Sequence, residues 1–91
     1  MGANVSSKRH QHQNEGQICN VMINGDKDLS MSIIPREMNI FDLKTKITFF
    51  TKIPQHRQQI FTASGYQCDD GAMLTDYNIR DGTSLRLKVK E

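Results

Sequence analysis

Two cysteines and three histidines are the residues of this 91-residue chain best suited to metal binding or nucleophilic chemistry. Cys19 and Cys68 are far apart, and each lies within an apolar pattern rather than in a Cys-x-x-Cys pair. The histidines, His10, His12 and His56, are not placed near the cysteines in a metal-ligand spacing. We expect two buried free thiols in a reducing compartment, with a disulfide as the alternative, and no metal or cofactor.

Paired carboxylates are the remaining candidates for acid–base chemistry. Asp70 and Asp76 lie in turn-like sequence, and we interpret both as turn-capping residues rather than as a catalytic pair. The sequence shows no nucleophile beside a base and no phosphate-binding loop. A foldable part of about 75 residues is also too small to form a deep cleft. The sequence therefore predicts a protein that is not an enzyme.

The first residues carry a lipidation pattern. Met-Gly-Ala-Asn-Val-Ser fits the N-myristoylation motif, with Gly2 as the acceptor and Ser6 at the second required position. Lys8 and Arg9 would add about 2 kcal/mol of attraction to anionic lipid, enough for weak membrane contact together with one acyl chain. The alternative is that this segment is an inert leader or a non-native start.

Composition limits the class of protein and its partners. The chain has 36% hydrophobic and 24% charged residues, an ordinary globular balance, and a net charge of +2 that does not indicate nucleic-acid binding. No apolar run approaches the roughly 20 residues of a membrane-spanning helix, and no secretion signal is present in the sequence. We expect a cytoplasmic or nuclear protein, associated with membranes only through Gly2.

Apolar residues are concentrated after the first 17 positions. Residues 1–17 are rich in Asn, Gln, Ser and His and cannot bury enough surface to offset the entropy of ordering them. We expect this segment to be a flexible tail and residues 18–90 to form one domain.

The first half of the domain predicts a hairpin followed by a helix. Residues 19–23 and 29–33 alternate apolar and polar side chains, and Asn24-Gly25 suits the positive φ angles of a tight turn between them. Residues 40–50 then repeat apolar residues with a helical period. Asn39 is the expected N-cap of this helix, with Asp42 three residues later.

The second half predicts two further strands. Residues 58–62 form a weak strand, and a short helical turn is expected around Leu74, Tyr77 and Ile79. After a turn at Asp81-Gly82, residues 85–90 show the clearest alternation in the chain. The element order predicts an α+β fold in which one helix lies across a mixed sheet.

Several short motifs in the domain resemble the ubiquitin family in order and nearly in spacing. These are Ile53-Pro54, Gln58-Gln59-Ile60-Phe61, Asp70-Gly71, Leu74-Thr75-Asp76-Tyr77-Asn78-Ile79 and Leu85-Arg86-Leu87. The resemblance covers residues 18–90 and implies a ubiquitin-like β-grasp, ββαββ with a short helical turn before the last strand. It also implies that the Tyr77 hydroxyl bonds to backbone in the loop 69–71. A longer connection between Phe61 and Asp70 departs from the family pattern.

The end of the sequence differs from that of conjugated relatives, which finish in Gly-Gly. Here Val89-Lys90-Glu91 is bulky and charged, so we expect a non-conjugated module that docks partners such as the ubiquitin and proteasome machinery. The alternative is a modifier whose Gly-Gly tail lies beyond Glu91. Positions matching ubiquitin's main linkage lysines are Ser64 or Gly65 and Asp81, whereas Lys27, Lys44 and Lys46 match other lysines and are equally explained as solvated residues.

The last strand suggests where a partner would bind. Alternation places Leu85, Leu87 and Val89 in the core and directs Arg86 and Lys88 to solvent. The resemblance assigns the family's binding patch to Asn24, Ile60 or Phe61, Arg86 and Lys88. One interpretation is an ordinary solvated face. The other is a docking face on a monomer, suited to a protein partner with an acidic rim around an apolar anchor.

Phe49 and Phe50 occupy adjacent positions near the end of the expected helix. Phe50 continues the apolar stripe and is expected in the core. Phe49 lies about 100° further round the helix, where we expect it to fold back on Met38 or Ile53. The alternative for Phe49 is an exposed aromatic anchor for a partner or for the tail.

Overall fold

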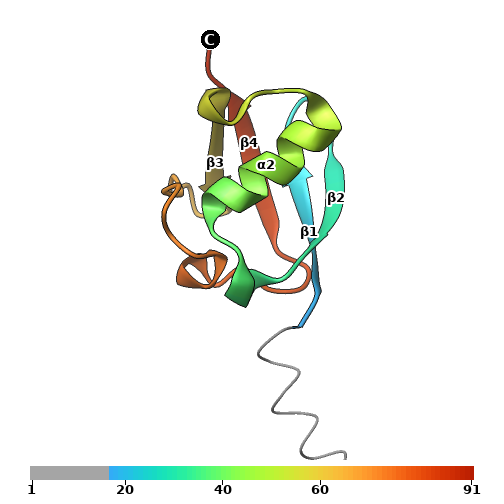
Figure 1. The fold of residues 1–91 in the computed structure, drawn as a ribbon, viewed down its shortest axis with the longest axis vertical. Helices are drawn as coiled ribbons and strands as arrows, with labels where there is room; N and C mark the ends of the chain where they lie inside the picture. The colour runs from blue at the N-terminus through green and yellow to red at the C-terminus, as the bar shows by residue number, and fades with distance from the viewer. Residues whose placement is uncertain (1–16) are drawn as a thin grey trace, which may run out of the picture.

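The computed structural model describes residues 17–91 of the chain. The expected myristoylation site at Gly2 and nearly all of the expected tail lie outside the described residues. Four strands and one α-helix form the body (Figure 1). They are β1 (Cys19–Asn24), β2 (Leu29–Ile33), α2 (Ile40–Thr51), β3 (Gln58–Thr62) and β4 (Ser84–Val89). Short 3-10 turns are η1 (Pro35–Glu37), η2 (Gln55–Arg57) and η3 (Leu74–Tyr77).

The sheet is mixed, with strand order β2-β1-β4-β3. β1 pairs antiparallel with β2 and parallel with β4, and β3 pairs antiparallel with β4. The helix crosses one face of this sheet and leaves the other face uncovered (Figure 1). The α+β expectation is confirmed, and the arrangement is compatible with a small β-grasp-like fold.

The core lies between α2 and the sheet, and local periodicity explains its members. Alternate residues of each strand and one stripe of the helix are buried, so the predicted periods of two and of 3.6 residues hold over most of the domain. The buried apolar residues are Cys19, Val21, Ile23, Met31, Ile33, Ile40, Leu43, Ile47, Ile60, Cys68, Leu74, Ile79 and Leu85. Both cysteines are free thiols, as expected.

The start of α2 is fixed by a reciprocal pair of hydrogen bonds. The Asp42 backbone N–H donates to the Asn39 side chain at 2.7 Å, and the Asn39 N–H donates to the Asp42 carboxylate at 3.0 Å. These contacts satisfy donors that the first helical turn leaves unpaired. The predicted N-cap is therefore confirmed. At the other end Lys52 takes a left-handed conformation, with φ 67°, and closes the helix.

The connection between the first two strands differs from the expected tight turn. Asn24 is the last residue of β1, and residues 25–28 form the loop before β2. Within residues 17–91 positive φ angles occur only at Lys52, Gly65, Asn78 and Gly82. The predicted Asn24-Gly25 turn was wrong because Asn24 pairs with Arg86 of β4 and is held in an extended conformation. The turn expected at Gly82 does have a positive φ, and so does Gly65 in the connection after β3.

The loop 69–72 packs against the beginning of α2 and seals one end of the core. The Tyr77 hydroxyl accepts a hydrogen bond from the Asp69 backbone N–H at 2.8 Å, as expected. The Phe41 N–H donates to the carbonyl of Asp70 at 3.1 Å. Asp76 accepts from the Met73 N–H at 2.9 Å and is a turn-capping residue, as predicted.

Lys44 and Asp70 form a contact that the sequence interpretation did not include. The Lys44 ammonium lies 2.6 Å from the Asp70 carboxylate, and its side chain is only 8% exposed while that of Asp70 is 55% exposed. The expectation that Lys44 is solvated was therefore wrong, as was the turn-capping role of Asp70. The long aliphatic stem of lysine is buried along the core while the ammonium reaches a carboxylate at the surface.

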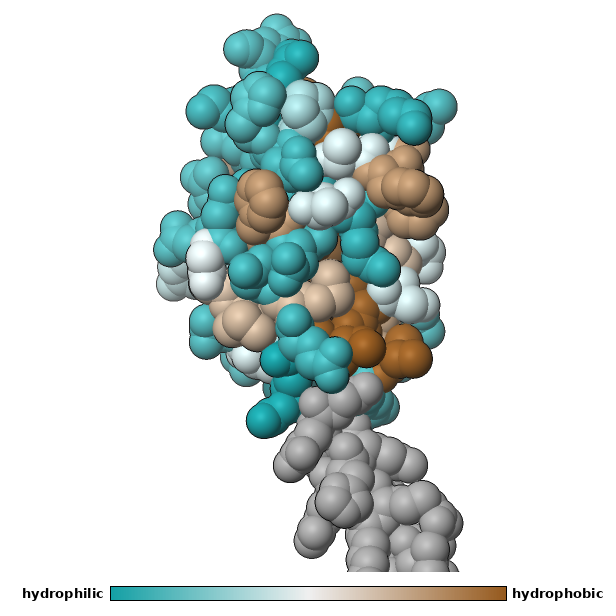
Figure 2. Space-filling model, viewed as in Figure 1, coloured by the Kyte–Doolittle hydropathy of each residue, from teal (hydrophilic) through white to brown (hydrophobic). Residues whose placement is uncertain are grey.

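The opposite end of the core is less covered than the sequence predicts. Phe50 is 59% exposed, Val89 is 38% exposed and Leu87 is only half-buried, although all three were expected in the core. The reason is that α2 ends at Thr51 and does not extend over the end of β4. Apolar residues visible from the helix side form separate patches among polar ones (Figure 2).

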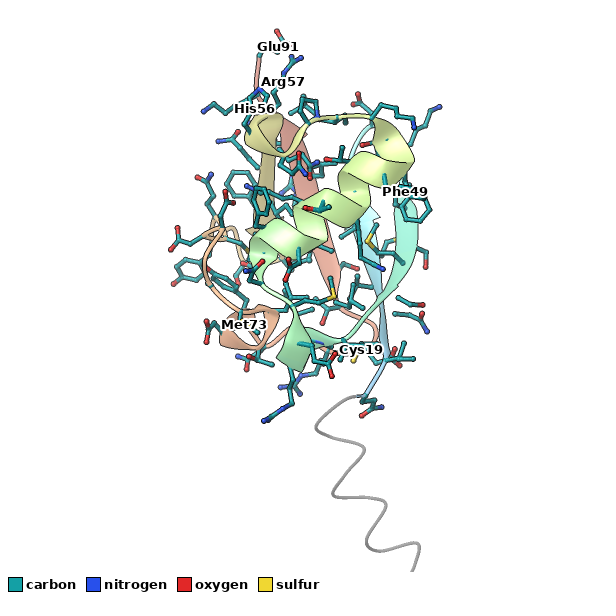
Figure 3. The ribbon with its side chains drawn as sticks, viewed as in Figure 1. Cys19, Phe49, His56, Arg57, Met73 and Glu91 are labelled. Atoms are coloured by element: carbon teal, nitrogen blue, oxygen red, sulfur yellow. The ribbon has the colours of Figure 1, made fainter. Side chains whose placement is uncertain are left out.

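Phe49 does not fold back on Met38 or Ile53. Its side chain is 75% exposed and projects from the last turns of α2 (Figure 3). The rings of Phe49 and Phe50 meet edge to face, with centroids 5.5 Å apart. The alternative expectation, an exposed aromatic residue, is the one that the structure shows.

Candidate interaction surface

The uncovered face of the sheet brings most of the predicted site residues together. In the strand register Arg86 of β4 is paired with Asn24 of β1 on one side and with Phe61 of β3 on the other. Lys88 lies two residues further along β4, paired with Gln59 of β3. We call Asn24, Gln59, Phe61, Arg86 and Lys88 the sheet-face cluster. It lies on the face turned away from the viewer in Figure 1.

Alternation along each strand fixes the outward direction of these side chains. Ile23 and Leu85 are buried immediately before Asn24 and Arg86, so the latter two side chains project from the opposite face. Ile60 is 0% exposed and points into the core. Its inclusion as a candidate binding residue was therefore wrong, and Phe61 is the residue of that pair on the solvent face.

Arg86 and Lys88 are exposed cations without an ionic partner in the described part of the chain. Within residues 17–91 the only ion pair is the one between Lys44 and Asp70. Arg86 and Lys88 are thus free to bind an external anion, and the planar guanidinium of Arg86 can hold a carboxylate through two hydrogen bonds.

Two further cations extend the positive surface toward the end of β4. The Arg57 Nε donates to the Lys90 carbonyl at 2.9 Å, and the Lys90 N–H donates to the Arg57 carbonyl at 2.7 Å. These contacts hold Arg57 of η2 beside the residue that follows β4. His56 and Arg57 lie at the same end of the molecule as Glu91 (Figure 3).

Sequence reasoning missed Gln59 and Arg57 as members of this surface. Gln59 shares the face of Phe61 because residues two apart on a strand point the same way, so the alternation of β3 was sufficient to identify it. Arg57 precedes the strand and is placed by pairing with Lys90, which lies 33 residues away. No local pattern in the sequence predicts that contact.

The sheet-face cluster is mainly polar, although Met22 of β1, which is 39% exposed, lies on the same face two residues before Asn24. Asn24 and Phe61 are half-buried, and Phe61 is the only large apolar side chain of the sheet-face cluster. A flat array of cations and amides can orient an acidic partner, but it offers little apolar area to bury. Affinity for a partner therefore requires further contacts.

The two cysteines lie in the core, away from this face. Cys68 is buried, and its burial together with the nearby carboxylate of Asp69 raises the pKa of the thiol to about 11, so it is protonated at neutral pH. Residues 17–91 contain no group of His, Cys, Asp and Glu side chains placed to hold a metal ion. No helix within them has the length and apolar character needed to cross a membrane.

The chain matches no protein-family model, and no curated protein matches it significantly in sequence. A functional proposal therefore depends on the chemistry of the sheet face and of the surfaces next to it.

Proposed function

We propose that the chain is a non-conjugated ubiquitin-like module that binds a protein partner through the uncovered face of its sheet. The motif resemblance over residues 18–90 supports this family, and the mixed sheet crossed by one helix is compatible with it. In this proposal the protein acts by docking rather than by catalysis, and a myristoyl group on Gly2 would add weak contact with an anionic membrane. The ubiquitin and proteasome machinery is the proposed class of partner.

The observation that supports the proposal is the row formed by Asn24, Arg86 and Phe61 across three paired strands, with Lys88 beside it. A rigid sheet holds the two cations at a fixed spacing, and within residues 17–91 neither is paired with an acid. Such an array fits a partner with carboxylates around an apolar side chain, because opposite charges speed association and fix orientation.

The same two cations disfavour partners that bind an apolar patch. A helix that inserts alanine or leucine against this face would desolvate Arg86 and Lys88 without offering them an acid. We therefore expect generic ubiquitin-interacting helices to bind weakly or not at all. The protein acts as a monomer in this proposal.

Charge reversal with a matched control tests the docking face. Peptides that bind the full chain are selected from a random library displayed on phage. Their affinities are then measured for the parent chain and for the variant Arg86→Glu/Lys88→Glu. We expect this variant to lose at least about tenfold in affinity, because acidic peptides would then meet two added carboxylates.

The control variant is Arg36→Glu/Arg80→Glu. It changes net charge by the same amount, and both residues are exposed and lie beside each other away from the sheet-face cluster. We expect it to bind the selected peptides nearly as well as the parent chain. Equal losses in the two variants would mean that binding follows net charge alone, and the docking face would have to be abandoned.

A further inference from the structure

A hollow of about 600 Å³ opens where α2 ends, between the loop 25–28 and the end of β4. We call it the helix-end hollow. Its lining includes Leu29, Phe50, Ile53, Leu87, Lys88 and Val89. Five of these are large apolar side chains, so the hollow presents the kind of surface that binding sites use and that a small monomer otherwise buries.

The lining contains the three residues whose burial the sequence predicted and the structure does not show. Phe50, Leu87 and Val89 follow the core periodicity of the helix and of the last strand, yet they remain partly accessible and converge on this one hollow. Their pattern is that of core residues, but the helix ends before it can cover them. A side chain from another molecule would complete the packing that α2 leaves unfinished.

The hollow adjoins the sheet-face cluster. Lys88 belongs to that cluster and also lines the hollow, between Leu87 and Val89 on the same strand. Alternation directs the Lys88 side chain to the sheet face and those of Leu87 and Val89 to the other side, and β1 pairs with β4 only as far as Arg86. A partner segment that passes around this open end of β4 can contact both surfaces. The two surfaces are complementary in chemistry, since the sheet face offers charge with little apolar area and the hollow offers apolar area next to it.

We infer that the helix-end hollow takes a large apolar side chain of the same acidic partner that binds the sheet face, an inference that rests on the proposed function. The occupant is a protein segment with one large aliphatic or aromatic residue flanked by carboxylates. The carboxylates of this segment lie toward Arg86 and Lys88, which have no ionic partner within residues 17–91. The other charges of the lining are of both signs, with Asp26 and Lys27 on the loop side and Glu91 after β4.

Adjacent phenylalanines supply a matched pair of variants for the test. Phe50 lines the hollow and Phe49 does not, although the two are neighbours on the helix and both are largely exposed. Random peptides selected on phage against the full 91-residue chain serve as the probe. We expect the selected peptides to share a large apolar residue next to Asp or Glu.

Phe50→Ser is expected to weaken binding of these peptides by about tenfold or more, and Phe49→Ser by less than about twofold. Unchanged thermal unfolding of both variants shows that the fold is retained, as their exposure predicts. Spectra of the ¹⁵N-labelled chain should show peptide-induced shifts at the amides of Leu87 and Val89 as well as at Arg86.

The outcomes separate the hollow from the sheet face. If Phe50→Ser binds normally while Arg86→Glu/Lys88→Glu does not, the docking face stands and the hollow is not its anchor site. If Phe50→Ser loses binding and the charge reversal does not, the proposed function itself fails. Peptides without an apolar residue, or equal losses for Phe49→Ser and Phe50→Ser, would also overturn the inference, as would the failure of any peptide to bind.

Discussion

The two ends of the helix meet the sheet in different ways. At the first end the cap of Asn39, the loop 69–72 and the Tyr77 hydroxyl close the core with a set of specific hydrogen bonds. At the second end α2 stops short, and Phe50 and Val89 remain partly in solvent. The comparison shows that one core can be closed by hydrogen bonds at one end and left open at the other, beside cations that have no ionic partner within residues 17–91.

Truncation of one apolar side chain at each end of α2 should give the largest difference. Leu43→Ala removes a fully buried side chain from the first half of α2 and is expected to lower the free energy of unfolding by about 3 kcal/mol. Phe50→Ala removes a 59% exposed ring and should cost less than about 1 kcal/mol. Urea denaturation of the two variants measures both values. Similar losses would show that the second end is as tightly packed as the first.

The ion pair at the closed end should give a smaller but distinct effect. Asp70→Asn leaves the ammonium of the largely buried Lys44 side chain without its anion and is expected to cost about 2 kcal/mol. Asp69→Asn is the matched control, since its side chain is exposed and forms no ion pair within residues 17–91. Chemical denaturation at neutral pH compares the two. A loss no greater than that of the control would mean that Lys44 is hydrated in the native state.

The third effect concerns Cys68 at the closed end and appears only at high pH. Burial raises the pKa of its thiol from the ordinary 9.0 to about 11, so the folded chain keeps this proton while the unfolded chain loses it. Stability is therefore expected to fall as pH rises from about 9 to about 11, and to be unaffected by this group below that range. Unfolding curves across this range, with Cys68→Ala as control, test the slope. If the stability of Cys68→Ala falls with pH as steeply as that of the parent chain, the pH dependence comes from other groups.

The sequence predicted most elements because their causes are local. β1, β2, β4 and α2 depend on residues only a few positions apart, as does the turn at Gly82, and the structure confirms these elements. The same patterns wrongly placed Phe50, Leu87 and Val89 in the core. The Asn24-Gly25 turn failed because pairing of β1 with β4 overrode a local turn preference. The burial of Lys44 was also missed, since its partner Asp70 lies 26 residues away.

The candidate site was predictable to the extent that alternation along the strands determines it. Asn24, Phe61, Arg86 and Lys88 lie on the predicted face because alternation determines it once the register is known. Ile60 was wrongly included because the resemblance left two adjacent residues open, and only the observed register separates them. The helix-end hollow was not predictable, since it depends on how far α2 reaches across β4 in space.

The place of β4 in the sheet bears on how the chain emerges from the ribosome. β4 lies between β1 and β3, so without it neither of those strands has its central neighbour. The β1–β2 hairpin and α2 can form early in synthesis, but the sheet closes only when residues 84–89 have left the exit tunnel. Until then the edges of β1 and β3 that pair with β4 are unpaired. The nascent chain is therefore most open to chaperone binding or misassembly after β3 has been translated and before β4 has left the tunnel.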